Sequence, residues 1–290
     1  MSKHNRDPLV YILIRNHNTY NLTIIAVKSL LKQSYKNYKI LIIDDGSNNN
    51  SFEILKNKFP NIQIIKTNKC IEYCKSFNLG IKYAIKRRAE YFFIINNDTD
   101  NFSINYLEKI VKIFRKNKKI GLVGSKCLDY EGRILWEKGI LKEKFGISRD
   151  TPDSGFVLSR TVLKKIGFLN EHLVRYFEDL DLIARMRKAG FITYAEPSIK
   201  YSHKSEGTSG KQSFVPNYYR VRNIIIFMKK YNKNESFFWK ISTFVDYSKI
   251  HFDRLIIAIK GNNYCRFFKI LGSIMLGVVN GLLTPWREND

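Results

Sequence analysis

The sequence predicts an α/β fold with a doubly wound, mostly parallel sheet and a helical extension at the carboxyl end, and three observations predict the sheet. Short apolar runs alternate with segments of helical periodicity over the first half of the chain, as expected when helices connect parallel strands. The apolar runs contain few polar residues, which is typical of strands covered on both faces. Several runs end in polar turns, at the sheet edge where such folds bind ligands.

The elements follow in order from the amino terminus. Residues 9–14 form the first predicted strand. The helix that follows begins after a cap at Thr19 or Asn18, and its expected apolar face comprises Leu22, Ile25, Ala26, Leu30 and Leu31. The next predicted elements are a strand at 38–43, a helix from residue 52, a strand at 61–65, a helix at 72–87 and a strand at 91–95.

The second half of the chain is less regular. A strand is predicted at 120–123, after which the segment to residue 153 shows no clear periodicity. The pattern then predicts a strand at 154–158, a helix at 161–166 that ends at Gly167, a helix beginning near residue 178 and a strand at 192–201. From residue 218 onward the pattern is helical and rich in aromatic residues and lysine.

The composition favours a folded, basic protein. Lys and Arg number 50 against 26 Asp and Glu, a formal net charge of +24, which favours nucleic acid, anionic lipid or phosphorylated small molecules as partners. An apolar content of 44% excludes global disorder. The four cysteines show no CxxC spacing and the first apolar run is too short for a signal sequence. A reducing, cytoplasmic location is therefore expected.

The stretch YFFIINNDTDNF combines a buried strand with an acidic tip. Asn96, Asn97, Asp98 and Asp100 follow the strand, where a parallel sheet presents residues to a ligand. Carboxylate and amide oxygens suit a hard divalent cation, which can bridge the phosphates of a nucleotide. The alternative is a polar turn that caps the next helix.

The segment DDGSNNNS, residues 44–51, also follows a predicted strand. Asp44 and Asp45 can accept hydrogen bonds from a base or ribose, while Gly46 allows a tight turn. A helix-capping turn explains the same residues without a ligand. The sequence contains neither GxGxxG after the first strand nor a GKS or GKT phosphate loop, which argues against a dinucleotide enzyme and a P-loop NTPase.

These motifs together resemble family 2 glycosyltransferases with the GT-A fold, the fold of nucleotide-diphospho-sugar transferases. The resemblance rests on IIDDGSNNNS, TNKC with FNLGIKYA, IINNDTD, SGFVLSRTVLKKIGFLNEHL, RYFEDLDLIARMRKAG, YSHKSEGTS and YYRVRN, and covers roughly residues 8 to 230. The acidic motif, Asn-x-Asp-Thr, is similar to that of the rhamnosyltransferase-like branch. The resemblance implies a catalytic domain at 1–230, with a nucleotide-binding half near 8–125 and an acceptor half near 126–230, and an extension at 231–290.

The resemblance also implies roles for residues of the first half. Asp45 and Asp44 are expected to contact the base or ribose, and Asp98 to ligate Mg²⁺ or Mn²⁺ on the diphosphate. Asn96 stands where many relatives have the first Asp, and Asp100 offers a second carboxylate. The nucleotide-binding set is completed by Asn16, Asn78 and Asn97. The family's glycine after the third strand is replaced here by Cys70.

The FEDLDL segment crowds Glu178, Asp179 and Asp181 together. Acids at the start of a helix that ends in basic residues complement the helix dipole, which explains them without catalysis. Three acids within four residues exceed what capping requires, and neighbouring like charges suit a general base. The resemblance implies that Asp179 removes the proton from the acceptor hydroxyl, with Glu178 orienting it or sharing that role, in a single inverting displacement.

Other residues of the second half are expected near the substrates. A lone His is more often structural than a ligand, but the resemblance places His203 at the metal or diphosphate. Gly155 and Trp136 are expected on the acceptor side. Lys204 and Lys211 could neutralise the departing nucleoside diphosphate, and the loop at 205–213 could order over the donor.

The carboxyl-terminal stretch leaves two interpretations open. Residues 267–283 include one Lys and end near Trp286 and Arg287, at the short limit for a membrane span. Helices lying on an anionic leaflet fit the interleaved aromatic and basic residues. Packing on the catalytic domain or in a homodimer is the alternative.

The leading hypothesis is an inverting, metal-dependent glycosyltransferase that moves a sugar, such as rhamnose, from a dTDP or UDP donor to a glycan or lipid-linked acceptor. A nucleic-acid-binding protein is a second class, suggested by the charge and the interleaved aromatics. Acidic clusters at strand ends would repel nucleic acid, so no nucleic-acid partner is expected. A catalytically silent scaffold at the membrane is the third.

Overall fold

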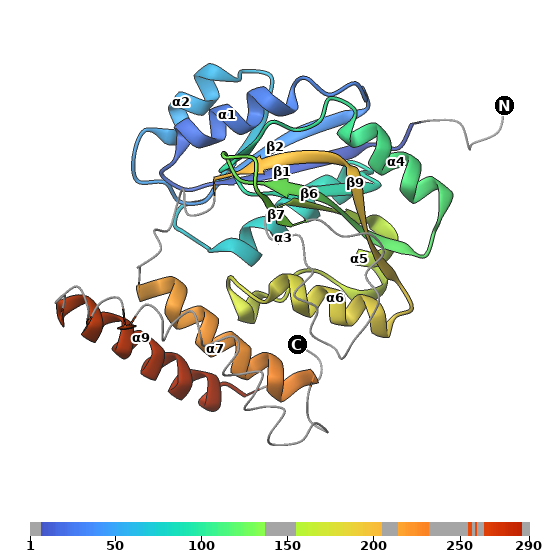
Figure 1. Cartoon of the computed structure of the whole chain (residues 1–290). Helices are drawn as coiled ribbons and strands as arrows, with labels where there is room; N and C mark the ends of the chain where they lie inside the picture. The colour runs from blue at the N-terminus through green and yellow to red at the C-terminus, as the bar shows by residue number, and fades with distance from the viewer. Residues whose placement is uncertain are drawn as a thin grey trace. The chain divides into compact units, whose positions relative to one another are not determined.

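The structure is a computed structural model, and it describes residues 7–136, 155–204, 214–231, 255–256, 259 and 264–285 (Figure 1). The chain forms two compact units. The first comprises residues 1–169 and 182–205, and the second comprises 170–181 and 206–290. This division lies earlier in the chain than the boundary that the sequence predicts at residue 230. The loop at 205–213, the segment at 137–154 and Trp286 with Arg287 lie outside the described residues.

The first unit holds the strands and most of the helices. Its strands are β1 (Val10–Asn16), β2 (Tyr38–Asp44), β3 (Gln63–Lys66), β4 (Tyr91–Ile95), β5 (Thr99–Asp100), β6 (Ile120–Leu128), β7 (Ile134–Trp136), β8 (Gly155–Ser159) and β9 (Ile192–His203). Its helices are α1 (Tyr20–Leu30), α2 (Ser51–Lys58), α3 (Tyr73–Lys86), α4 (Tyr106–Lys116) and α5 (Arg160–Ile166). Helix α6 (Glu178–Lys188) begins in the second unit and continues into the first.

One sheet joins these strands in the order β3-β2-β1-β4-β8-β6-β9-β5, with β7 paired to β6. Strands β1 to β4 pair in parallel, and β9 runs parallel to β6. Strand β8 is antiparallel to both of its neighbours. The predicted mostly parallel, doubly wound sheet is therefore confirmed. Because β1 lies between β2 and β4, the chain reverses its direction of travel across the sheet there, and such a switch point opens a crevice at the strands' carboxyl ends.

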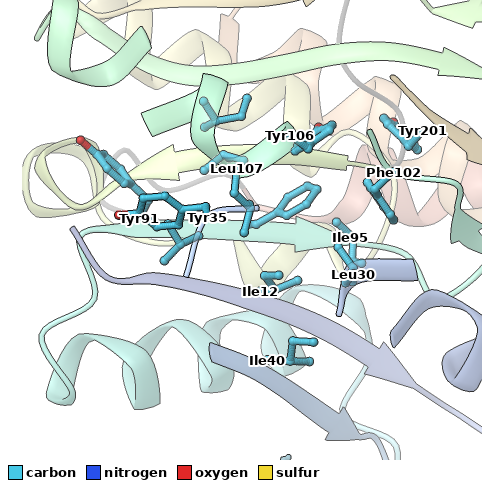
Figure 2. Packing of buried hydrophobic residues seen from close by; sticks show 14 of the residues in the cluster. Ile12, Leu30, Tyr35, Ile40, Tyr91, Ile95, Phe102, Tyr106, Leu107 and Tyr201 are labelled. Atoms are coloured by element: carbon cyan, nitrogen blue, oxygen red, sulfur yellow. The ribbon is translucent and has the colours of Figure 1, made fainter. Parts of the chain in front are cut away.

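Two apolar layers cover the sheet. On one face, residues of α1 and α4 pack on alternate residues of β1, β2 and β4. On the other face, the opposite set of strand residues packs against α3, α5 and the part of α6 in the first unit. Figure 2 shows side chains of the first layer, including the aromatic group of Phe102, Tyr106 and Tyr201. The strands are buried on both sides, which explains why their sequences do not alternate.

The apolar face expected for the first helix was wrong. Ile25 and Leu31 are 48% and 51% exposed, and α1 instead buries Thr23, Ala26, Val27 and Leu30. A helical apolar pattern as wide as this one allows more than one buried face, and packing on the sheet selected the other. The residues after β4 do not cap a helix: they form β5, and α4 begins only at Tyr106. The pairing of β5 with β9 therefore argues against the alternative in which these residues cap the next helix.

The second unit contains a 3₁₀ turn at Glu171–Leu173, the first turn of α6, and helices α7 (Phe214–Tyr231) and α9 (Tyr264–Leu283). Helices α7 and α9 pack closely because small residues of α9 face α7. A Cβ added at Gly277 would lie 2.8 Å from the carbonyl oxygen of Tyr218, and one at Gly281 would lie 2.9 Å from that of Arg222. Within the described ranges, no helix is both long and apolar enough to cross a membrane.

Candidate active site

Hydrogen bonds join the carboxyl ends of β1, β2 and β4. The Asn16 side chain, at the end of β1, donates from Nδ2 to Asp44 Oδ2 at 2.7 Å and accepts from the Thr23 hydroxyl at 2.7 Å. Asn97, two residues after β4, donates to the hydroxyls of Thr23 at 2.9 Å and Thr19 at 2.7 Å. This buried relay connects residues from three strand ends across the switch point. Asn16, Asp44 and Asn97, all predicted at the site, therefore belong to one network.

The turn after β2 is built for close backbone approach. Gly46 has φ +63°, and a Cβ there would lie 2.2 Å from the backbone nitrogen of Cys70. No other residue fits, because that neighbour is backbone and cannot move aside cheaply. The fully buried Asp44 carboxylate accepts from the backbone N–H and the hydroxyl of Ser47 at 3.3 and 2.9 Å. Asp44 thus closes the turn, and its contact with a nucleotide stays a prediction.

Asp45 ties the end of β1 and the loop after β3 to this turn. Its carboxylate accepts from Arg15 Nε at 2.8 Å and Nη2 at 2.6 Å, and from the backbone N–H groups of Ile71 and Glu72 at 2.7 and 3.1 Å. Burial opposes ionisation, but the Ile71 hydrogen bond and the Arg15 guanidinium outweigh it and hold the pKa of Asp45 below its ordinary value. The Asp45 carboxylate is therefore a fixed anion at neutral pH.

The acidic tip after β4 meets the end of β9. Thr99 pairs with His203 in the antiparallel β5–β9 ladder. His203 Nε2 lies 3.3 Å from Asp98 Oδ1, and the backbone N–H of Lys204 donates to the Asp98 carbonyl at 2.8 Å. Both side chains are less than 10% exposed. Residues more than 100 positions apart in the sequence are thus neighbours, as the predicted metal set of Asp98 and His203 requires.

Asp100 lies beside them. The Tyr130 hydroxyl donates to Asp100 Oδ2 at 2.7 Å, whereas Oδ1 is buried and has no hydrogen-bond partner among the described residues. Partial burial, the hydrogen bond to Asp100 and the charges of Asp100 and Asp98 together raise the pKa of Tyr130. Both carboxylates therefore act on the same hydroxyl. Asn96 is half-buried, and its carbonyl accepts from the Thr99 hydroxyl at 2.6 Å.

These residues fit a cation that is shared with a diphosphate. Within the described part of the chain, no three His, Cys, Asp or Glu residues gather closely enough to hold a metal by themselves. Mg²⁺ in nucleotide sites is commonly bound through one or two carboxylates while phosphates and water complete the octahedron. The open oxygen of Asp100 and the carboxylate of Asp98 supply that donor set.

Three other predicted residues have defined places in the first unit. The buried Asn78 amide donates to the Leu169 carbonyl at 2.9 Å and accepts from its N–H at 3.0 Å, so it clamps the chain after α5. Gly155 pairs with Ile95 at the end of β4, and an added Cβ would lie 3.2 Å from the Tyr201 ring. Trp136 is the last residue of β7. The substrate roles of all three stay predictions.

Glu178 and Asp179 open α6 in the second unit. Asp179 Oδ1 accepts from the backbone N–H of Leu180 at 2.8 Å, and both acids are half-buried. Arg185, Arg187 and Lys188 occupy the last turn of α6, the charge order that the helix dipole favours. The roles of Glu178 and Asp179 as general base stay predictions.

Three residues of the site were not singled out by the sequence. Thr23 carries the relay, and its signal was a polar residue among the buried positions of α1. Arg15 directly follows the first predicted strand, but nothing in the sequence marks it as the ion-pair partner of Asp45. Tyr130 falls in an irregular segment with no periodicity, so nothing in the sequence relates it to Asp100.

Comparisons with known proteins identify the family of the chain. The family model described as glycosyl transferase family 2 matches residues 11–167. An uncharacterised glycosyltransferase of Rickettsia typhi is 27% identical over an alignment covering 99% of this chain and 94% of that protein. The dTDP-rhamnosyl transferase RfbF of Shigella flexneri is 25% identical over 76% of this chain and 80% of its own length.

A solved structure is similar in fold. The mannosyltransferase of Pyrobaculum calidifontis, in complex with GDP-Man and Mn²⁺, superimposes with a TM-score of 0.58, covering 97% of this chain and 77% of that one. At 10% identity this likeness concerns the fold alone. The site assembled at the ends of β1, β2 and β4 therefore lies in an architecture that other sugar-transferring proteins share.

Proposed function

The chain belongs to glycosyl transferase family 2, and on that premise we propose that this glycosyltransferase moves a sugar from a nucleoside-diphosphate donor to a hydroxyl acceptor, with metal assistance and inversion at the anomeric carbon. The GT-A fold predicted from the sequence is confirmed by the solved glycosyltransferase it resembles. The observation that carries the proposal is the hydrogen-bonded relay that links Asn16, Asp44 and Asn97 beside Asp98. It unites the predicted nucleotide and metal motifs at the switch point of the sheet.

The turn after β2 would receive the base and ribose. Two nitrogens of Arg15 and two backbone N–H groups already donate to the Asp45 carboxylate, which offers about four acceptor positions, and the Thr67 hydroxyl and the Cys70 thiol donate to it at 3.3 and 3.5 Å. A base or ribose group would therefore replace one of these donors, and the hydrogen bonds from Thr67 and Cys70 are the longest of them. The backbone of Gly46, pressed against Cys70, leaves this turn no room for a side chain.

Asp98 and Asp100 would hold Mg²⁺ or Mn²⁺, with His203 beside Asp98 and Asn96 at the entry to the turn. When bound, a divalent cation neutralises the diphosphate and makes it a better leaving group. The residues' own task is positional. The β5–β9 ladder fixes Asp98 against His203, and the Tyr130 hydroxyl orients Asp100. The pairing of β5 with β9 therefore sets the positions of Asp98 and His203.

Asp179 would act as the general base. The acceptor hydroxyl gives its proton to the Asp179 carboxylate as its oxygen attacks the anomeric carbon, and the glycosidic bond forms as the bond to the diphosphate breaks. Glu178 would orient Asp179 or share the proton. Both acids lie in the first turn of α6, where the positive end of the helix dipole favours negative charge.

The donor class follows from a relative. RfbF of Shigella flexneri is described as a dTDP-rhamnosyl transferase, and its similarity supports dTDP-rhamnose as the first donor to try. UDP sugars are the alternative. The acceptor would be a glycan or a lipid-linked sugar of a surface polysaccharide or glycoconjugate, because these offer the hydroxyl that the chemistry needs.

Calorimetry with dTDP and UDP, with and without Mn²⁺, tests the proposal. We expect micromolar binding that depends on the metal, and we expect Asp98→Ala to remove the metal-dependent part. Glu108→Ala, an exposed acid on α4, is the matched control and should bind like the wild type. Unchanged affinity of Asp98→Ala would move the ligand role to Asp100. Tight, salt-sensitive binding to random oligonucleotides with no nucleotide binding would instead favour a nucleic-acid-binding protein.

We also propose that the second unit attaches to an anionic membrane surface at the cytoplasmic face. Four apolar residues of α9 are between 60% and 73% exposed: Phe268, Met275, Leu282 and Leu283. An amphipathic helix with such a face binds at headgroup depth, and the net charge of +24 adds attraction to anionic lipid. A homodimer that covers the same face is the competing arrangement.

A further inference from the structure

The backbone just before α6 is strained. Val174, Tyr176 and Phe177 have φ values of 65°, 63° and 68°, in the left-handed region that residues with a Cβ seldom adopt, least of all a β-branched one. None of the three is glycine. Such a conformation persists only where surrounding contacts hold it, and it is found most often next to functional residues. Glu178 and Asp179 follow immediately.

One side chain of α7, Asn223, donates to three carbonyl oxygens of this turn. Asn223 is fully buried, and its Nδ2 donates to the carbonyl oxygens of Leu173 at 2.7 Å, Arg175 at 2.8 Å and Tyr176 at 2.9 Å. Three acceptors converge on an amide with two hydrogens, so one hydrogen is shared. The amide thereby binds carbonyl oxygens on both sides of Val174.

The orientation of the amide is itself set. Arg222 Nη1 donates to Asn223 Oδ1 at 2.8 Å and to the His172 carbonyl at 3.0 Å. With its oxygen fixed by a guanidinium, the amide must present its N–H₂ group to the turn, so the assignment of its oxygen and nitrogen follows from the network. An Asp at 223 has the same shape but no donor, and would face three carbonyls with a negative charge.

The same face of α7 contacts residues before and after Asp179 in the sequence. Phe227 packs its ring against Phe177 with centroids 5.9 Å apart. Lys230 Nζ and the Tyr231 hydroxyl donate to Asp181 Oδ1 at 2.9 and 2.7 Å. Positions 223, 227 and 230 recur at the spacing of one α-helical face. Contacts from α7 therefore flank the Glu178–Asp179 pair on both sides.

We infer that Asn223 is a positioning residue for the general base: it fixes the left-handed turn at 174–177 so that the first turn of α6 presents the Asp179 carboxylate in one orientation. The inference rests on the proposed function, in which Asp179 takes the acceptor proton. Asn223 itself would touch neither substrate. Its effect should appear in the chemical step and not in the binding of the donor.

The test compares Asn223→Ala with the wild type in the full chain. With dTDP-rhamnose, or the nucleotide sugar that a donor panel identifies, we expect kcat to fall by about 100-fold, the loss that a misplacement of about 1 Å produces. The dissociation constant for dTDP with Mn²⁺ should stay within about twofold in calorimetry, because donor binding does not use the turn. The matched control is Asn280→Ala, which removes an amide bonded to the Tyr218 hydroxyl in the same unit. It should lower the melting temperature without lowering kcat.

A rescue variant separates positioning from general stability. Glycine adopts positive φ without steric cost, so Val174→Gly in the Asn223→Ala background should recover kcat by about 10-fold if the amide serves to hold that backbone. If Asn223→Ala does not fold, Asn223→Gln decides, because it retains the amide but displaces it by one methylene. It should show the same split between kcat and donor binding.

Two outcomes would overturn the inference. One is a kcat within about threefold of the wild type in a folded Asn223 variant, and the other is an equal loss of kcat and dTDP binding. Asp179→Asn is measured alongside. An active Asp179→Asn would remove the base assignment itself, whereas an inactive Asp179→Asn with a fully active Asn223→Ala would remove only the positioning role.

Discussion

At the scale of single residues, the carboxylates of the site differ in how many donors the protein supplies. Asp45 is enclosed by Arg15 and two backbone N–H groups, whereas Asp100 keeps one buried oxygen without a partner among the described residues. A carboxylate whose donors are all present has a fixed place and charge. One with an open buried oxygen carries a desolvation cost that an arriving cation would remove. The same side-chain type thus has two physical roles at neighbouring strand ends.

Asp45→Asn should make stability depend less on pH. The folded-state pKa of Asp45 is below its ordinary value, so its stabilising contribution is present above about pH 4 and is lost as the pH falls through the folded value. At pH 7 we expect the variant to lose about 3 kcal/mol of unfolding free energy, the cost of removing one partner of a buried ion pair. Urea unfolding at several pH values measures this, and the gap to the wild type should narrow below about pH 4.

The exposed pair of Glu108 and Lys112 provides the comparison, since both side chains are more than 40% exposed. Glu108→Gln should change the unfolding free energy much less at pH 7. A gap between wild type and Asp45→Asn that stays constant down to pH 2 would contradict the ion-pair account.

Thr23→Val should destabilise the first unit by about 1–3 kcal/mol, because it removes one hydrogen bond from each of the buried amides of Asn16 and Asn97. Thr193→Val is a matched control. The Thr193 hydroxyl is buried and has no hydrogen-bond partner within the described residues, so its removal should be neutral or stabilising. Equal losses for the two variants, measured by urea unfolding, would show that the relay contributes nothing.

At the scale of elements, a short strand and small residues determine which strands pair and which helices pack closely. Strand β5 is only two residues long, yet its pairing with β9 brings His203 beside Asp98. Aromatic packing supports that pairing. The centroid of the Phe102 ring lies 5.4 Å from that of Tyr201, on which it stacks, and 5.5 Å from that of Tyr106, which it meets edge-on (Figure 2). In the second unit, glycines of α9 allow backbone contact with α7.

Gly277→Ala should separate α9 from α7. The new Cβ would lie 2.8 Å from the Tyr218 carbonyl oxygen, which belongs to a helix backbone and cannot turn aside. We expect a loss of about 1–3 kcal/mol in stability, seen as a lower melting temperature by circular dichroism. Gly272→Ala in the same helix meets nothing within 4 Å and should stabilise by up to about 1 kcal/mol through helix propensity. Identical effects of the two substitutions would contradict close packing.

At the scale of the whole molecule, the sign of the net charge is opposite to that of the charges at the candidate site. The chain carries a net charge of +24, yet the ends of β2 and β4 and the residues just after them carry four buried acids, Asp44, Asp45, Asp98 and Asp100. A nucleoside diphosphate brings further negative charge to these acids, so a divalent cation between them is electrostatically sensible. The excess of Lys and Arg in the rest of the chain would attract an anionic surface.

Phe268→Glu should weaken binding to anionic vesicles. Phe268 is 65% exposed on α9, and Ile104, the matched control in the first unit, is also 65% exposed. Flotation with phosphatidylglycerol liposomes should show a loss of at least about tenfold for Phe268→Glu, from lost apolar insertion and added repulsion, and little change for Ile104→Glu. Undiminished flotation together with a shift from dimer to monomer in light scattering would assign this face of α9 to a homodimer.

The sequence by itself determined the local elements and the identity of the chemical groups. Unbroken apolar runs predicted β1, β2 and β4, because strands covered on both faces need no alternation, and the polar turns after them marked Asp45 and Asp98. It also indicated the family, since ordered motifs survive where overall identity is low.

Only the tertiary structure decided which of these groups meet. It placed β1 between β2 and β4, joined Asn16 to Asn97 through Thr23, brought Tyr130 to Asp100, and put Asn223 against the turn before Asp179. The physical reason is that periodicity along a chain reports local conformation and burial, whereas partners 30 to 100 residues apart are selected by how strands pair and helices pack. The buried face of α1 illustrates the difference, because packing against the sheet buries Thr23 and leaves Ile25 exposed.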